Sequence, residues 1–215
     1  GLLEAEIVTA DGVVRIANVR NEPDLFWEIK GGGGGSWGVI TKLTLRTHDL
    51  PLLGGGRGRN KAHSDDAYHR LIERFVAFYS ESLLNPHWGE QVSFAPDNTL
   101  NLNMSCQGLD ARQVTEVWQP FIDWVNASPN DFSILGRINL QGKEDRDTWN
   151  AETNKGMNKD TRDGAPKHHG WWRGDQGQVW AYLHGYDSLW LPASLLRPVA
   201  RPKLVDALFA SSRHK

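Results

Sequence analysis

Residues 24–41 read DLFWEIKGGGGGSWGVIT, and this stretch decides how the first part of the chain is built. Its opening residues, Asp24 to Lys30, predict a short helix because their apolar side chains recur at helical spacing. Five consecutive glycines, residues 31–35, then end that helix, since glycine is a poor helix former. A strand is expected over Val39–Thr47, where side chains alternate between two faces. The chain therefore passes from helix to strand through backbone that carries no side chains.

Two further strands are expected before this stretch. Residues 1–9 and 13–19 are rich in Val and Ile, which favour strands. The tripeptide Ala10-Asp11-Gly12 between them supplies a tight turn. The first section is thus predicted to run strand, strand, helix, strand.

A change of pattern separates this section from the rest of the chain. Asp49-Leu50-Pro51 and then Gly54-Gly55-Gly56 interrupt the strand pattern, so we place a domain boundary there, between residues 1–50 and residues 51–215. The second part is predicted to be α+β, an antiparallel sheet with helices covering one face. Residues 142–177 are expected to be mostly loop. Three helices are predicted in this part: one over Ser64–Leu83, one that begins at a capping box formed by Asp110 and Gln113, and one that begins at Pro202. Four strands are predicted, over Gln91–Pro96, Thr99–Gln107, Phe132–Gln141 and Gln178–Tyr186.

The glycine run has three possible explanations. A flexible linker would join two complete domains, but this run lies between an apolar helix and an apolar strand of one small unit. A phosphate-binding loop needs a strand before the glycines and a helix after them, and the order here is the reverse. Close approach of the backbone to a flat or bulky ligand fits best, because glycine has no β-carbon.

Two stretches of this section resemble a known family. They are EAEIVTADG, residues 4–12, and NEPDLFWEIKGGGGGSWGVITKLTL, residues 21–45. Together they are similar to the closing part of the flavin-binding domain in berberine-bridge-enzyme-like FAD-linked oxidases. These belong to the wider vanillyl-alcohol-oxidase group, whose FAD-binding domain is called PCMH-type. The resemblance implies that residues 1–50 are the C-terminal part of such a domain and that the rest is a substrate-binding domain, incomplete at its C-terminus.

The resemblance also implies a cofactor and its contacts. In this family the segment lies along bound FAD, and main-chain groups of the strand after the glycines touch it. Trp37 stands where the family more often has Phe or Tyr, which fill the same apolar slot. Carried over by position, the expected FAD contacts are Gly35, Ser36, Gly38, Val39 and Ile40.

The predicted strand over residues 178–186 has an unusual face. One side carries small apolar residues, which helices would cover, and the other carries Trp180, Tyr182, His184 and Tyr186. These rings could simply pack together in a half-buried strand. However, residues 168–196 resemble the substrate-domain segment of bacterial members of the family, where the sheet covers the isoalloxazine ring. Trp180 is then expected to contact the substrate.

The family reaction, which the resemblance implies for the full-length protein, is oxidation of an alcohol, sugar or secondary metabolite. The substrate transfers a hydride from a C–H bond to the flavin while a base removes a proton. The candidates for this base are Tyr182, His184 and Tyr186.

The strand over residues 99–107 shows the same alternation. Its apolar side chains share one face, and Asn101 and Asn103 lie on the opposite, hydrogen-bonding face. They either face solvent or recognise substrate hydroxyl groups beside the flavin.

Other chemistry finds little support. The adjacent pair His168-His169, near Asp175, lacks further ligands at zinc spacing, so no metal site is expected. Cys106 sits within an apolar alternation, where a thiol behaves as a small hydrophobe. The net charge of −2 does not favour nucleic acid or anionic membranes. The expected partner is a small-molecule substrate, with association through an exposed sheet edge as a further possibility.

Some questions stay open at this level. The upstream part of the flavin domain is not recognisable within the chain, so we expect the isolated chain to bind FAD weakly or not at all and to be inactive. A carbohydrate- or ligand-binding module without flavin is the alternative, suggested by the tryptophan-rich face, and a catalytically silent interaction protein is another. Substrate, electron acceptor and cellular location are not specified by the sequence.

Overall fold

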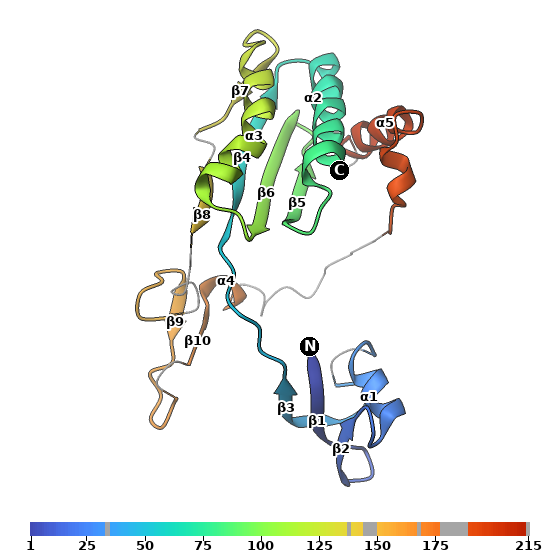
Figure 1. Cartoon of the computed structure of the whole chain (residues 1–215), viewed down its shortest axis with the longest axis vertical. Coiled ribbons are helices and arrows are strands. Elements are labelled where there is room, and N and C mark those ends of the chain that lie inside the picture. Colours follow the sequence, from blue (N-terminus) through green and yellow to red (C-terminus); the bar gives the residue numbers. More distant parts are fainter. Residues whose placement is uncertain (33–34, 137–138, 144–149, 167–168, 177–188, 214–215) are drawn as a thin grey trace. The chain divides into compact units, whose positions relative to one another are not determined.

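The structure is a computed structural model that describes residues 1–32, 35–136, 139–143, 150–166, 169–176 and 189–213. The chain divides into two compact units, unit 1 over Gly1–Asp49 and unit 2 over Leu50–Lys215, each described by itself (Figure 1).

Unit 1 is a three-stranded antiparallel sheet with one short helix. Its strands are β1 (Leu2–Val8), β2 (Val14–Asn18) and β3 (Val39–Leu45), and its helix is α1 (Pro23–Ile29). The strand order is β2-β1-β3, so β1 is the central strand and pairs with both neighbours. Every element predicted for this section is present, and the ends differ from prediction by at most two residues.

The core of unit 1 is small. Four of its hydrophobic side chains are fully buried, and they are Ala5, Ile7, Ala17 and Phe26. Strand β3 is exposed along its whole length. Unit 1 therefore leaves much of its apolar surface in contact with solvent.

Unit 2 contains a five-stranded antiparallel sheet. Its strands are β4 (Leu53–Ala62), β5 (Trp88–Phe94), β6 (Thr99–Gln107), β7 (Phe132–Ile134) and β8 (Asn139–Lys143). The strand order is β5-β6-β4-β7, and β8 pairs with the first half of β4. Strand β4 thus lies in the middle of the sheet.

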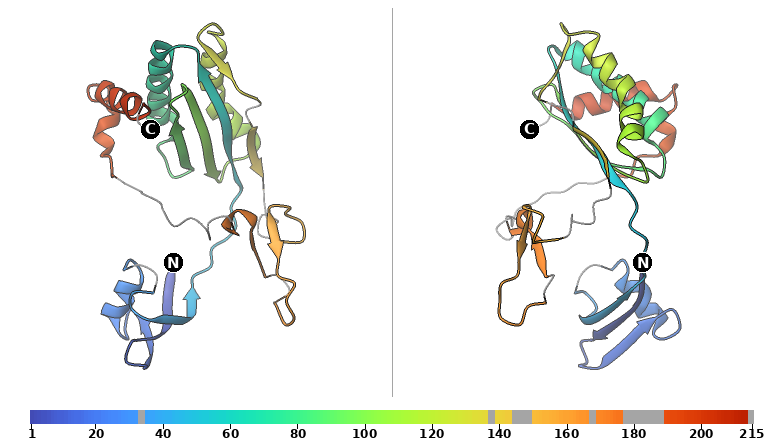
Figure 2. Two further views of the ribbon diagram at one scale, coloured as in Figure 1. Left: turned by 180° about the vertical axis from the view of Figure 1, so that it is seen from behind. Right: turned by 60° about the vertical axis from the view of Figure 1, so that its left-hand side comes forward.

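Helices cover one face of this sheet, as Figure 2 shows. They are α2 (Asp65–Phe78), continued by a π-helical turn (Tyr79–Leu83), then α3 (Ala111–Asn126) and, after a 3₁₀ turn (Ala193–Leu196), α5 (Arg201–Ser211). A single core fills the space between helices and sheet; its largest fully buried side chains are Trp118, Tyr68, Phe121, Leu71, Ile72, Leu83, Leu100 and Met104. The predicted α+β fold with helices on one face is confirmed.

The helix starts follow local signals. In α3 the Asp110 carboxylate accepts a hydrogen bond from the Gln113 backbone N–H at 2.8 Å, and the Gln113 side chain accepts one from the Asp110 N–H at 2.9 Å. This is the predicted capping box, and it satisfies backbone donors that the helix itself leaves unpaired. At the start of α2 the Ser64 hydroxyl accepts a hydrogen bond from the Ala67 N–H.

The prediction for Gly54–Gly56 was wrong, because these residues do not interrupt the sheet but belong to its central strand. A β-carbon on Gly55 would lie 1.8 Å from the Met104 carbonyl oxygen on β6. A β-carbon on Gly56 would lie 2.9 Å from the Trp118 ring. The glycines therefore let β6 and the largest core side chain approach the β4 backbone.

Two other predictions need adjustment, and a third is not tested. The strand expected over Phe132–Gln141 is two strands, β7 and β8, which pair with opposite ends of β4. The expected loop over residues 142–177 contains strands β9 (Met157–Lys159) and β10 (Gly170–Trp172) and the short helix α4 (Arg173–Gln176). The strand predicted over residues 178–186 lies outside the described residues.

Candidate functional site

The glycine run begins by closing helix α1. The backbone N–H groups of Gly31 and Gly32 both donate to the Glu28 carbonyl, at 3.1 Å and 2.6 Å. A β-carbon on Gly32 would lie 2.3 Å from the Trp37 indole nitrogen, so this glycine makes room for the Trp37 ring. Part of the run is thus explained by packing within unit 1.

Gly38 also has an internal reason to be glycine. Its φ of +147° lies in the region that side chains disfavour, and a β-carbon would lie 2.3 Å from the Val8 carbonyl oxygen. Its missing side chain lets the chain enter β3 directly beside β1.

Gly31 and Gly35, unlike Gly32 and Gly38, are not explained by packing within unit 1. No atom lies within 4 Å of the position that a β-carbon would take on either residue. Gly35 also has a φ of +79°, a left-handed conformation that costs other residues free energy. The space beside these two glycines is open, so their backbone is accessible to something outside unit 1.

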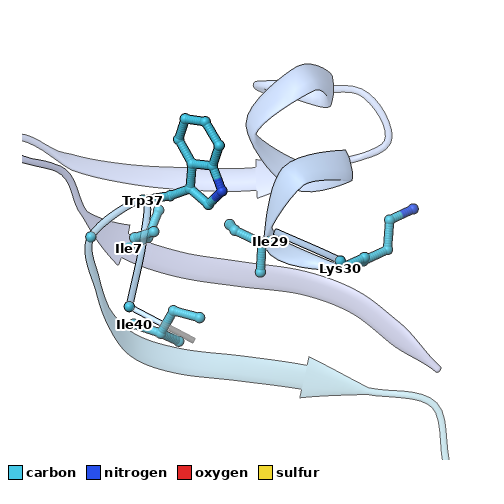
Figure 3. A pocket seen from close by; sticks show the side chains of 8 residues that line it. Ile7, Ile29, Lys30, Trp37 and Ile40 are labelled. Atoms are coloured by element: carbon cyan, nitrogen blue, oxygen red, sulfur yellow. The ribbon is translucent and has the colours of Figure 1, made fainter. Parts of the chain in front are cut away.

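Two pockets lie at this open backbone. The first has a volume of about 270 Å³, and Figure 3 shows it with Ile7 and Ile40 from neighbouring strands and Ile29 from the end of α1. The second, of about 730 Å³, lies against the other side of the segment. The residues that line both are Gly35, Trp37 and Gly38; Ile40 and Gly31 line only the first, and Ser36 and Val39 only the second. All five residues predicted to contact FAD line at least one of these pockets.

The rim of these pockets is apolar and solvent-exposed. Val39 is 68% exposed and Ile40 is 41% exposed. Within the part of the chain that the structure describes, β3 pairs with β1 alone, so alternate backbone N–H and C=O groups along its outer edge are unpaired. The segment offers both an apolar surface and main-chain hydrogen-bonding groups.

A compact ion pair stands at the second pocket. Arg15 donates to both carboxylate oxygens of Asp11, at 2.9 Å and 2.8 Å, and the Thr9 hydroxyl donates to one of them at 2.6 Å. The hydrogen bonds from Arg15, and then that from Thr9, hold the pKa of the Asp11 carboxyl well below its usual range. Because Asp11 neutralises Arg15, this pocket carries no free cation from that pair.

The second candidate site lies on the face of the five-stranded sheet that the described helices leave uncovered, called the uncovered face below. Asn103 accepts a hydrogen bond from Arg57 at 2.8 Å and donates to Gln91 at 3.2 Å. Asn101 donates to Ser93 at 3.3 Å. These amides, with both β5 partners, line a pocket of about 540 Å³. The structure therefore brings the two predicted substrate contacts, Asn101 and Asn103, together in one site.

Sequence reasoning missed the cations beside these amides. Arg57, Arg59 and Lys61 alternate along β4, and such a period of two was a readable signal. It was overlooked because the glycines before Arg57 had been interpreted as a break between domains.

It also missed a buried carboxylate in unit 2. The Asp160 side chain is 1% exposed and accepts hydrogen bonds from Arg162, at 2.9 Å and 2.6 Å, while His169 Nδ1 lies 2.6 Å from it. The hydrogen bonds from Arg162, followed by that from His169, lower the pKa of the Asp160 carboxyl. The sequence had placed His169 near Asp175, but its partner is Asp160.

The structure does not describe some of the remaining candidates from the sequence. Several candidates lie outside the described residues: the candidate bases Tyr182, His184 and Tyr186, the candidate substrate contact Trp180, and His168.

Within the described ranges no group of three His, Cys, Asp or Glu side chains could hold a metal ion. Cys106 is buried under the helices, and burial raises the pKa of its thiol. None of the helices described here is both long and apolar enough to span a bilayer.

Comparison with known proteins gives consistent matches. The FAD-linked oxidoreductase malF of Malbranchea aurantiaca is 51% identical over 81 residues, which are 37% of this chain and 14% of that protein. The VAO-type flavoprotein oxidase VAO615 of Thermothelomyces thermophilus is 31% identical over 125 residues, which are 57% of this chain and 21% of that protein. The chain thus corresponds to a minor part of the length of these relatives. No family model matches the chain.

A solved structure supports the fold. The crystal structure of the VAO-type flavoprotein MtVAO615 from Myceliophthora thermophila C1 superposes with a TM-score of 0.62 at 20% identity, covering 99% of this chain and 34% of that one. Together with the sequence matches, this bears out the family resemblance: the chain is similar to part of the FAD-linked oxidoreductases and VAO-type flavoprotein oxidases.

Proposed function

We propose that this chain is part of an FAD-dependent oxidoreductase, in which unit 1 holds the cofactor through the segment Gly31–Ile40 and unit 2 binds the substrate. The observation that carries the proposal is the open backbone at Gly31 and Gly35, beside two pockets that all five expected FAD contacts line. The matched relatives are named as FAD-linked oxidoreductases and VAO-type flavoproteins.

The residues of this segment fit a flat aromatic cofactor. Isoleucine side chains from three elements line the smaller pocket, and they offer an apolar surface. The backbone of Gly35 can approach a ring closely because no side chain intervenes. The ammonium of Lys30 lies 4.5 Å from the centre of the Phe26 ring, so this cation is held beside the pocket by a cation–π contact.

The reaction we propose is oxidation of a small molecule at a C–H bond, with the substrate an alcohol, a sugar or a secondary metabolite. When bound, FAD supplies the hydride acceptor for this step. The part of this chain is to hold the cofactor from unit 1 and to orient the substrate through the amides of Asn101 and Asn103. The base that removes the accompanying proton is proposed among Tyr182, His184 and Tyr186. A small-molecule substrate is the one partner we propose.

The base assignment has a direct test. Tyr182→Phe, Tyr186→Phe and His184→Ala are introduced separately into the polypeptide of the complete reading frame. The variant that removes the base is expected to slow flavin reduction by about 10²- to 10⁴-fold, and to change its pH dependence. If all three variants reduce the flavin at the normal rate, the base lies elsewhere.

The cofactor assignment is tested by a matched pair of glycines. Gly12 and Gly35 both have φ near +80° and open space at the β-carbon position, but Gly12 lies in the β1–β2 turn and lines neither pocket. Both substitutions to alanine strain the backbone by a similar amount, roughly 1 kcal/mol. Flavin absorbance per polypeptide should fall in Gly35→Ala and stay unchanged in Gly12→Ala.

Two results would contradict the assignment. One is equal flavin content in both variants. The other is a complete polypeptide that purifies without flavin and is retained on a polysaccharide, which would favour the alternative, a carbohydrate-binding module.

A further inference from the structure

We propose that the uncovered face of the unit 2 sheet binds a carboxylate group, with Arg57 as its principal contact, and that the substrate is therefore a small organic acid. This inference rests on the proposed function, because it assigns the class of substrate to the same face.

The strand register places polar side chains in two rows across the sheet. Arg57 lies directly opposite Asn103, which in turn lies opposite Gln91. One step along, Arg59 lies opposite Asn101, and Asn101 opposite Ser93. Each row thus has a cation on β4, an amide on β6 and a polar side chain on β5. Cations two residues apart on one strand are about 7 Å apart, which is close enough for one small ligand to meet both.

The described residues place no carboxylate in an ion pair with Arg57 or Arg59. Among the described side chains of the five strands, the one carboxylate is Glu90. It lines the pocket that Asn101 and Asn103 line, but its register opposite Met104 directs its side chain to the face that the helices cover. Asp97, in the turn between β5 and β6, is engaged by Lys61 at 3.4 Å. No ion pair joins Arg57 or Arg59 to another described residue. Among the described residues, this face therefore carries two positive charges that no ion pair compensates.

The donors and acceptors in the Arg57–Asn103–Gln91 row also favour a negatively charged ligand. A guanidinium can only donate, so Arg57 fixes the amide oxygen of Asn103 as acceptor and its NH₂ group as donor. That NH₂ group donates to the side-chain oxygen of Gln91, and the NH₂ group of Gln91 remains as a further donor. The terminal nitrogens of Arg57 make no hydrogen bond to another described residue. Donors therefore dominate at this row, and a donor-rich surface selects a ligand rich in acceptors.

A carboxylate fits this arrangement best. It is planar, and a guanidinium can bind it through two parallel charge-assisted hydrogen bonds. A nucleic acid backbone would need more cations than these two, and the chain as a whole carries a charge of −2. The Asn103 amide holds the Arg57 guanidinium in place, so little side-chain freedom is lost when the ligand binds.

The test compares two probes of the same shape, phenylacetate and its neutral isostere phenylacetamide, by isothermal titration calorimetry on the 215-residue chain. Phenylacetate is expected to bind about tenfold more tightly, as one charge-assisted pair provides. Arg57→Gln should remove this preference, and Arg57→Lys, which keeps the charge but not the planar fork, should keep part of it. Arg112→Gln is the matched control, since Arg112 is an exposed cation on α3, and it should bind like the unaltered chain.

Three outcomes would overturn the proposal: equal affinity for the acid and the amide, an equal loss in Arg57→Gln and Arg112→Gln, or binding of inorganic phosphate as tight as that of phenylacetate. Circular dichroism of each variant shows that a loss of binding does not come from unfolding. Because the titration uses no flavin, its failure leaves the oxidoreductase proposal standing. Conversely, a flavin-free complete polypeptide would not alter the result for the carboxylate.

Discussion

The two glycine-rich stretches of this chain look alike in sequence and differ in what surrounds them. At Gly55 and Gly56 of unit 2, the places of the absent side chains are occupied by the protein itself, by the β6 backbone and the Trp118 ring. In unit 1, the places beside Gly31 and Gly35 are empty. A glycine whose missing side chain is filled by its own fold serves packing. A glycine beside open space is available to a ligand.

The same contrast extends to the two units as a whole. Unit 2 has helices over one sheet face and a core with several aromatic rings in contact; the Phe78 and Phe121 rings, for example, stack at 5.2 Å. Unit 1 has four fully buried hydrophobic side chains and exposes β3 throughout. Stability is therefore expected to depend on unit 2, and cofactor contact on unit 1.

The largest expected effect comes from matched tryptophan substitutions. Trp118→Ala leaves a cavity in the unit 2 core and should lower the free energy of unfolding by about 3–5 kcal/mol. Trp27 in unit 1 is 70% exposed, and Trp27→Ala should change it by less than about 0.5 kcal/mol. Urea unfolding followed by circular dichroism measures both. Similar losses would show that the two units do not differ in this way.

The glycines themselves give the next largest effect. In Gly55→Ala the new methyl group meets the Met104 carbonyl, which should destabilise the chain by about 1–3 kcal/mol through overpacking. In Gly31→Ala it meets open space, so the change should stay within about 0.5 kcal/mol. Thermal unfolding of the two variants provides the comparison. A stable Gly55→Ala variant would refute the packing explanation for the β4 glycines.

Substitution of the residue at a helix start should give a smaller difference in stability between the two units. Asp110→Ala removes the carboxylate that caps α3 and should cost about 1 kcal/mol. Helix α1 in unit 1 has no side-chain cap, since Glu22 at its start makes no capping hydrogen bond. Glu22→Ala should therefore change stability by less than about 0.5 kcal/mol. Chemical denaturation of both variants would reveal a contradiction if Glu22→Ala cost as much as Asp110→Ala.

Two carboxylates, Asp160 in unit 2 and Asp11 in unit 1, should make the stability of the chain fall at low pH. The contribution of Asp11 is expected to be the smallest effect. The pKa of both Asp160 and Asp11 is lowered by folding, so each stabilises the chain above its unfolded-state pKa, about 3.9, and loses that contribution as the pH falls through the folded value. Asp160 is buried, whereas the Asp11 side chain is 51% exposed and is screened by salt. Asp160→Asn should flatten the acid limb of the stability profile more than Asp11→Asn, and added salt should reduce only the latter effect.

Local signals in the sequence predicted much of this fold. The Asp110–Gln113 box lies within one helical turn, and the strands of unit 1 follow from alternation over a few residues. The role of Gly54–Gly56 could not be predicted in this way. It depends on Met104 and Trp118, which are distant along the chain and are brought to the glycines only by folding.

The candidate site residues also differ in whether they lie close together in the sequence or are brought together only by folding. The five expected FAD contacts occupy consecutive or near-consecutive positions, so a short motif was sufficient to propose them. The Arg57–Asn103–Gln91 row crosses three strands, and the pairing of Asp160 with His169 depends on the β9–β10 hairpin. Neither is visible until the strand register is known.

The central claim is that the backbone after Gly31 lies against bound FAD. Hydrogen–deuterium exchange of the complete polypeptide, with FAD and after its removal, measures this directly at the amides of residues 35–40. We expect slower exchange of these amides when FAD is present, with the β1–β2 turn at Gly12 unchanged. Equal exchange at residues 35–40 in both states, with protection confined to other segments, would contradict it.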